Sequence, residues 1–98
     1  MTESLHGVAE LLGESLRAWR IEGAVREEEG VAIIECGETR LRVTPAPPDH
    51  FFRWIVHTGM RERGFTGIPG LLRGVRGLLD PDYEASRLKI AARPVLEP

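Results

Sequence analysis

The spacing of hydrophobic and polar positions is clearest in residues 67–79. Their apolar side chains recur every three or four positions, which is the pattern of a helix buried along one side. The stripe consists of Ile68, Leu71, Leu72, Val75, Leu78 and Leu79. Thr66 can cap the first turn, and Asp80-Pro81 stops the helix. The pattern therefore predicts a helix over residues 67–79.

Two glycines, Gly74 and Gly77, interrupt this predicted helix. Each destabilises a helix by about 1 kcal/mol relative to alanine. A glycine is tolerated best where another part of the chain comes too close for a side chain. We therefore expect Gly74 and Gly77 to pack against another backbone element, most simply the first helix.

The first half of the chain changes from helical spacing to alternation. Residues 3–18 have a helical stripe of Leu5, Val8, Leu11 or Leu12, and Leu16. From residue 19 apolar and polar positions alternate, as in a strand with one buried face. We predict strands over residues 19–26, 31–36 and 40–44, because glycine-containing turns separate them. Together they form a three-stranded antiparallel meander.

The second half is harder to assign. Pro45-Ala46-Pro47-Pro48 is a stiff connector that ends the sheet. Residues 50–63 contain aromatic and β-branched residues that suit a strand, but Asp49 and Gly64 are typical of helix ends. We choose a helix there because both end signals are present. Alternation over residues 87–93 predicts one more strand.

These elements predict one α+β domain spanning residues 1–98, with the order α-β-β-β-α-α-β. The sheet is antiparallel, formed by the three-stranded meander and the C-terminal strand, and about three helices cover one of its faces.

Composition and charge narrow the class of protein. The chain has 98 residues, is 42% hydrophobic and 29% charged, and carries a net charge of −2, which is an ordinary globular balance. It contains no run of about 18 apolar residues and no signal-peptide pattern, so we expect a cytoplasmic protein that does not enter a membrane. Nearly all of its basic residues are arginine, which we interpret as the coding bias of a GC-rich, bacterial genome.

Few residues suggest chemistry. Cys36 is the only cysteine, and we expect it to be buried, where a thiolate is disfavoured. His50 and His57 are two helical turns apart in the predicted helix, too far to share a metal ion. Cys36, His57 and Asp49 could form a nucleophilic site only if the fold brought them together. We therefore expect no cofactor, no metal and no catalytic residue, and we disfavour an enzyme.

A glycine-rich turn precedes the helix of residues 67–79. Gly67-Ile68-Pro69-Gly70 has the spacing of loops that clamp a nucleic-acid backbone, but its central pair is apolar. Free backbone N–H groups at a helix start attract anions. Gly67, Gly70 and Arg73 are therefore a candidate anion-binding turn. The face with Arg73 and Arg76 lacks the other base-reading side chains of a recognition helix.

The sheet suggests a second surface. If the apolar positions of the strands face the helices, the opposite face collects basic residues, opposed there only by Glu22 and Glu35. No aromatic residue for base stacking lies among them. The candidate interaction surface consists of Arg20, Arg26, Val31, Ile33, Arg40, Arg42, Arg87 and Lys89.

The sequence favours a small non-enzymatic binding or assembly module that acts through an unknown protein partner or through a second copy, as a homodimer. The alternative is a phosphate- or nucleic-acid-contacting protein, which would use Arg20, Arg40, Arg42 and Lys89 or the Gly67–Gly70 turn. Nucleic acid is disfavoured by the net negative charge. A small enzyme of unknown reaction is the third reading.

Overall fold

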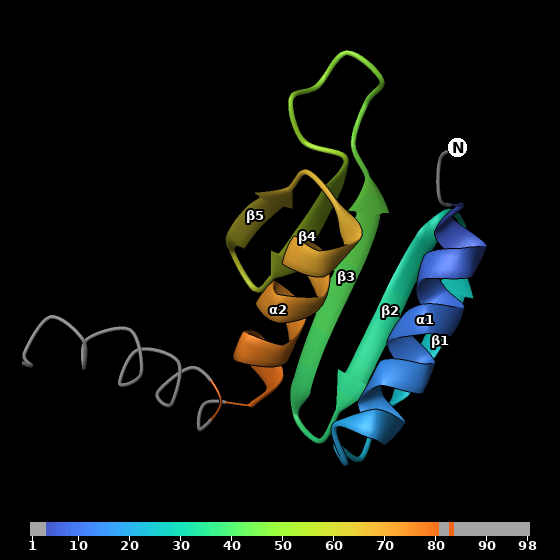
Figure 1. The fold of residues 1–98 in the computed structure, drawn as a ribbon, viewed down its shortest axis with the longest axis vertical. Coiled ribbons are helices and arrows are strands. Elements are labelled where there is room, and N and C mark those ends of the chain that lie inside the picture. Colours follow the sequence, from blue (N-terminus) through green and yellow to red (C-terminus); the bar gives the residue numbers. More distant parts are fainter. Residues whose placement is uncertain (1–3, 81–82, 84–98) are drawn as a thin grey trace, which may run out of the picture.

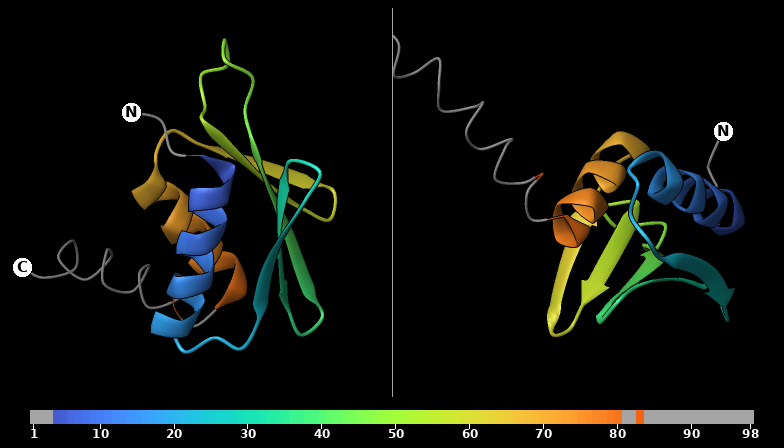
Figure 2. Two further views of the ribbon diagram at one scale, coloured as in Figure 1. Left: turned by 90° about the vertical axis from the view of Figure 1, so that its right-hand side faces the viewer. Right: turned by 90° about the horizontal axis from the view of Figure 1, so that it is seen from below.

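The computed structural model describes residues 4–80 and residue 83, which form an α+β fold (Figure 1). The elements in chain order are α1 (Leu5–Ala18), β1 (Ala24–Glu28), β2 (Val31–Cys36), β3 (Thr39–Pro45), β4 (Trp54–Thr58), β5 (Arg61–Phe65) and α2 (Ile68–Leu79). The five strands form one antiparallel sheet in which each strand pairs with its neighbour in sequence. Both helices lie on the same face of this sheet (Figure 2). The predicted α+β class, the antiparallel meander and the predicted helices over residues 3–18 and 67–79 are confirmed.

Tight turns set the register of the sheet. Between β1 and β2, Glu29 and Gly30 both have positive φ (48° and 79°), as the hairpin turn that matches strand twist requires. Gly37 and Gly59 have φ values of 59° and 57° in the two other short turns. A conformation with positive φ favours glycine, so these residues determine where the chain reverses.

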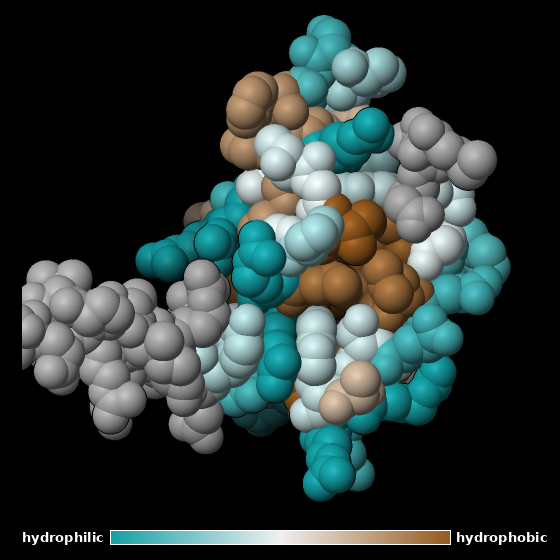
Figure 3. Space-filling model, viewed as in Figure 1, coloured by the Kyte–Doolittle hydropathy of each residue, from teal (hydrophilic) through white to brown (hydrophobic). Residues whose placement is uncertain are grey.

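The hydrophobic core lies between the helices and the sheet. It is formed by Val8, Ala9, Leu12 and Leu16 of α1, by Ala32, Ile34, Leu41, Val43, Trp54 and Val56 of the strands, and by Leu71 and Val75 of α2. α1 packs on β1 and β2, and α2 packs beside β5. Figure 3, which looks onto the helices, shows apolar surface in the seam between α1 and α2.

The predicted helix over residues 50–63 is wrong. Residues 46–53 form a loop, and β4 and β5 form a hairpin. Trp54 and Val56 are buried while Ile55 and His57 face the other side, so the segment does alternate, although three of these four residues are apolar. Gly64, interpreted as a helix end, is in a strand instead.

The number of helices and the strand order therefore need correction. The described residues contain two helices rather than three, and their order is α-β-β-β-β-β-α. The predicted strand over residues 87–93 lies outside the described residues.

The first strand also begins later than predicted, because α1 ends in a structured cap. The N–H of Ile21 donates to the carbonyl of Leu16 (2.9 Å), and the N–H of Arg20 donates to that of Arg17 (3.1 Å). Arg20 has a φ of 60°, the left-handed conformation of this type of cap. The strand can start only after this turn, at Ala24.

Candidate interaction surface

The sheet has one face covered by the helices and one that points away from them, which we call the open face. Directly paired residues of antiparallel strands share a face, so the register assigns the open-face residues in rows. The row that we call the charged row contains Arg26, Ile33, Arg42, His57 and Glu62. The adjacent row, which we call the apolar row, contains Glu28, Val31, Thr44, Ile55 and Gly64.

The apolar row is extended by an aromatic side chain from the loop of residues 46–53. A β-carbon added to Gly64 would lie 2.2 Å from Cδ2 of Phe52, so the ring covers the glycine. Val31, Ile55 and Phe52 are all partly exposed. Phe51, beside Phe52, is 81% exposed, which makes it one of the two most exposed large hydrophobic residues of the described chain. The loop end of the open face is therefore apolar.

The charged positions of the open face are largely paired with one another. Glu35 accepts from Nη2 of Arg40 at 2.7 Å and lies 3.4 Å from Nε of Arg26. Arg26 also forms an ion pair with Glu28. The hydrogen bond from Arg40, followed by the positive charge of Arg26, lowers the pKa of the Glu35 carboxyl. These contacts make the face mixed in charge rather than basic.

His57 links the two rows near the centre of the open face. Its Nε2 lies 3.1 Å from the hydroxyl of Thr44, and its Nδ1 lies 3.2 Å from Oε2 of Glu62. The ring bridges β3 to β5 and holds the Glu62 carboxylate on the outermost strand.

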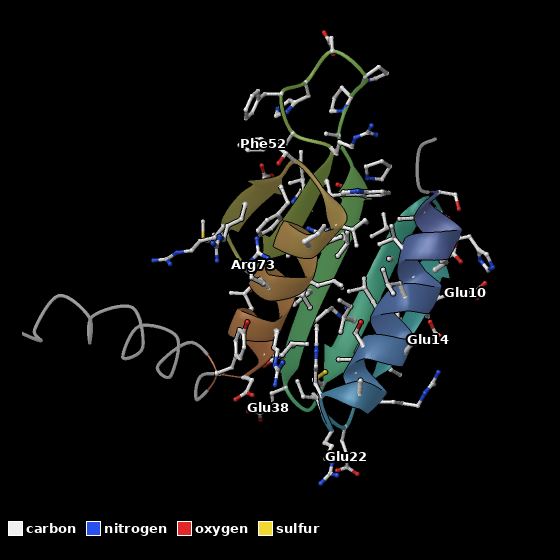
Figure 4. The ribbon with its side chains drawn as sticks, in the orientation of Figure 1. Glu10, Glu14, Glu22, Glu38, Phe52 and Arg73 are labelled. Atoms are coloured by element: carbon white, nitrogen blue, oxygen red, sulfur yellow. The ribbon has the colours of Figure 1, made fainter. Side chains whose placement is uncertain are left out.

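Some predicted surface residues lie elsewhere. Arg26, Val31, Ile33, Arg40 and Arg42 do share the open face. Arg20 lies in the turn after α1, and Figure 4 places Glu22 in the same connection. Arg87 and Lys89 lie outside the described residues. The expectation that only Glu22 and Glu35 oppose the cations is wrong, because Glu28 and Glu62 also lie on this face.

The sequence did not indicate five residues that lie on or beside the open face: Phe52, Thr44, Ile55, His57 and Glu62. Four of them follow the proline-rich connector and fall in or beside the segment predicted as a helix. The signal that could have identified a hairpin there is the strand-forming run Trp54–Thr58, which leads directly into a turn at Gly59-Met60.

The candidate anion-binding turn lies at the start of α2. Gly67 is the N-cap residue, with extended backbone (φ −161°, ψ 173°) and no side-chain hydrogen bond to the helix. Nη2 of Arg73 would be 4.0 Å from a β-carbon at Gly70, so the guanidinium folds back toward this turn (Figure 4). Gly67, Gly70 and Arg73 are thus close together, on an element that does not contribute to the open face.

Cys36 and His57 cannot form a nucleophile and base pair. Cys36 packs with the core on the helix-covered face, whereas His57 lies on the open face. Burial raises the pKa of the Cys36 thiol, which keeps it protonated. Among residues 4–80 and 83, no group of three or more His, Cys, Asp and Glu residues could hold a metal ion.

The two edges of the sheet are poorly suited to strand pairing with another chain. β1 presents Arg26, Glu27 and Glu28, and β5 presents Arg61, Glu62 and Arg63, all of them exposed. Charged side chains on edge strands discourage the addition of a further strand.

No family model matches this sequence, and no curated protein or solved structure is significantly similar to it. Neither helix of the described part is long and apolar enough to cross a membrane.

Proposed function

We propose that this protein is a non-enzymatic binding or assembly module that contacts another protein molecule through the open face of its sheet. The observation that carries the proposal is the apolar row, in which Val31, Ile55 and the ring of Phe52 are partly exposed on the face that neither helix covers. Protein interfaces combine such apolar and aromatic residues with paired polar groups.

The apolar row is large enough to matter energetically. Complete burial of a valine, isoleucine or phenylalanine side chain contributes about 1.5–3 kcal/mol relative to full exposure. Val31, Ile55 and Phe52 are already partly buried, so binding of a partner would gain only part of this free energy from each side chain. A contact of micromolar strength is the expected outcome, because association also has an entropic cost.

The paired charges favour protein over nucleic acid as the partner. Arg26 and Arg40 both contact Glu35, so a phosphate backbone would have to displace a carboxylate from each. A protein partner can leave these pairs intact at the rim of the contact. The start of α2 is an alternative site for a free phosphate, but apart from Arg73 and the backbone N–H groups of the turn nothing in the described residues favours it.

Position-specific photo-cross-linking tests the proposal. A photoreactive amino acid replaces Ile55 on the open face, or Glu14 on the outer side of α1 (Figure 4), in cells that produce the full chain. The cross-linked peptides are then identified by mass spectrometry. We expect reproducible cross-links from position 55, to this chain or to one other protein, that disappear with the added substitution Val31→Lys. Equal cross-linking from both positions, or none from position 55, would contradict the proposal.

A further inference from the structure

We infer that the occupant of the open face is a second copy of this chain, packed face to face about a two-fold axis that runs along the central strand β3. The inference rests on the proposed function and names its partner. In a two-fold interface each patch must complement itself, so the arrangement of residues around β3 decides whether a second copy fits.

The strand order defines which residues would meet. β3 is the middle of the five strands, so an axis along it sets β1 against β5 of the second copy and β2 against its β4. Each row of the open face then meets the same row in reverse order.

The apolar row complements itself under this operation. Val31 on β2 meets Ile55 on β4 of the second copy, and the reciprocal contact forms on the other side of the axis. Thr44 lies on the axis. Two aliphatic contacts are therefore buried on either side of the axis, at the loop end of the face.

The charged row is complementary at its two ends. Arg26 on β1 meets Glu62 on β5 of the second copy, again twice by symmetry. Ile33 and His57 meet in the positions between. Like charges meet on the axis itself, where Arg42 meets its own copy and, in the next row, Arg40 meets its own copy. Arg40 is already paired with Glu35 of its own chain, so these contacts weaken the dimer without opposing the others.

A two-fold axis perpendicular to the strands fits less well. If it passes through the charged row, Arg26 and Glu62 each meet their own copies. If it passes between the rows, the apolar row meets the charged row, with Thr44 against Arg42 and Ile55 against His57. If it passes through the apolar row, Val31 and Ile55 meet their own copies, but so does Glu28, and Arg26 does not reach Glu62. Of these arrangements, only the one along β3 both buries apolar residues against apolar residues and sets opposite charges against each other.

The available area predicts a weak dimer. Five strands about 4.8 Å apart and about five residues long present a face of roughly 400 Å² in projection. Stable interfaces bury about 800 Å² of accessible surface from each partner, so this face is at the low end even with its side chains and Phe51 included. We expect a dissociation constant in the micromolar range.

Charge reversal with mixing of variants tests the inference. Sedimentation velocity measures association of the full-length chain at about 10–200 μM, a range that brackets micromolar affinity. Arg26→Glu alone and Glu62→Arg alone each place like charges together twice, and each is expected to raise the dissociation constant about tenfold or more. An equimolar mixture of the two variants restores opposite charges at both contacts, so it should associate at least as tightly as the unmodified chain.

The rescue cannot arise within one chain. Arg26 and Glu62 are on the outermost strands, four strand spacings or about 19 Å apart. The matched controls Glu22→Arg, in the turn after α1, and Arg73→Glu, on α2, change net charge equally away from the open face and should leave association unchanged. Circular dichroism confirms that each variant is folded. A third variant, Arg42→Gln, removes one of the two like-charged contacts on the axis, the other being that of Arg40, and should tighten the dimer severalfold.

The outcomes separate this inference from the proposed function. A monomeric mass for the unmodified chain at about 200 μM overturns the inference that a second copy binds the open face. Cross-linking from position 55 decides independently whether this face binds another protein. A dimer that neither reversal weakens, or that mixing does not restore, forms through another surface such as the seam between α1 and α2 and also overturns the inference.

Discussion

Phe65 lies directly against the backbone of Gly74, because a β-carbon added to the glycine would be 2.3 Å from Cζ of the ring. The prediction that Gly74 packs against the first helix is therefore wrong in its partner, although the close approach exists. The contact joins α2 to β5 at a position where a side chain does not fit.

Gly74→Ala is expected to destabilise the protein by about 1 kcal/mol, since overpacking costs about 1–3 kcal/mol and helix propensity returns about 1 kcal/mol. Gly70→Ala is the matched control in the same helix, because its β-carbon would lie 3.7 Å from the same ring, an ordinary contact distance. Urea unfolding of both variants measures the difference. A more stable Gly74→Ala protein would show that the ring moves aside freely.

Arg76 connects the ends of the two helices through aromatic rings. Its guanidinium carbon is 5.4 Å from the Trp19 ring centroid and 4.3 Å from that of Tyr83. Arg76→Ala should lower the free energy of unfolding by about 1–2 kcal/mol, and Arg76→Lys by about half as much, because lysine has no planar group to stack. Arg73→Ala, one turn earlier and exposed, should change it by less than about 0.5 kcal/mol. Equal effects at both positions would argue against stacking.

His6 couples α1 to β1 in a pH-dependent way. Its Nδ1 lies 2.5 Å from Oε1 of Glu27 and its Nε2 lies 2.6 Å from Oε1 of Glu10. The hydrogen bond and charge of Glu27, and then the charge of Glu10, raise the pKa of His6 above 6.5. Because its pKa is raised, protonated His6 stabilises the folded state fully below about pH 6.5. This stabilisation disappears as the pH rises through the pKa of His6 in the folded protein.

The substitution His6→Gln should therefore destabilise the protein at about pH 5.5 and have little effect at about pH 8.5. Glu27→Gln, which removes the first cause of the raised pKa of His6, should give a similar loss at the lower pH. Unfolding curves at the two pH values measure the difference. The same loss at both values would mean that protonation of His6 is not responsible.

The pairing of the open-face arginines predicts weak binding to nucleic acid. We expect no complex with duplex or single-stranded DNA or RNA tighter than about 10 μM at physiological salt, which is weaker than specific complexes. Fluorescence anisotropy over a range of salt concentrations measures this. Tighter, salt-dependent binding that Arg40→Glu with Arg42→Glu abolishes would instead support a phosphate-binding surface.

The sequence predicted correctly those elements whose apolar positions recur on the side that packs against the core. α1, β3 and α2 each have one apolar side, and β2, which is apolar on both faces, lies between two glycine-containing turns. The hairpin of β4 and β5 was not predicted because Trp54, Ile55 and Val56 are apolar on both faces of the strand. Asp49 and Gly64 also imitated helix ends, while Gly64 is a glycine because the ring of Phe52 occupies the space of its side chain.

About half of the residues of the candidate surface could be assigned to one face of the sheet from the sequence alone, because successive residues of a strand point to opposite faces. Val31, Ile33 and Arg42 lie on the open face because β2 and β3 keep their register from one turn to the next. The pairing of Arg26 with Glu28 and Glu35 could not be predicted, since it depends on side-chain conformations across two strands. Ile55 and Glu62 could be placed only once the hairpin was known.

Backbone amide NMR signals, followed on dilution from about 500 to about 20 μM, across the expected dissociation constant, report whether a second copy binds the open face. We expect the amide signals of Val31, Ile33, Thr44 and Ile55 to shift with concentration, while those of the outer side of α1 stay fixed. Signals that do not depend on concentration, or shifts confined to α1 and α2, would contradict it.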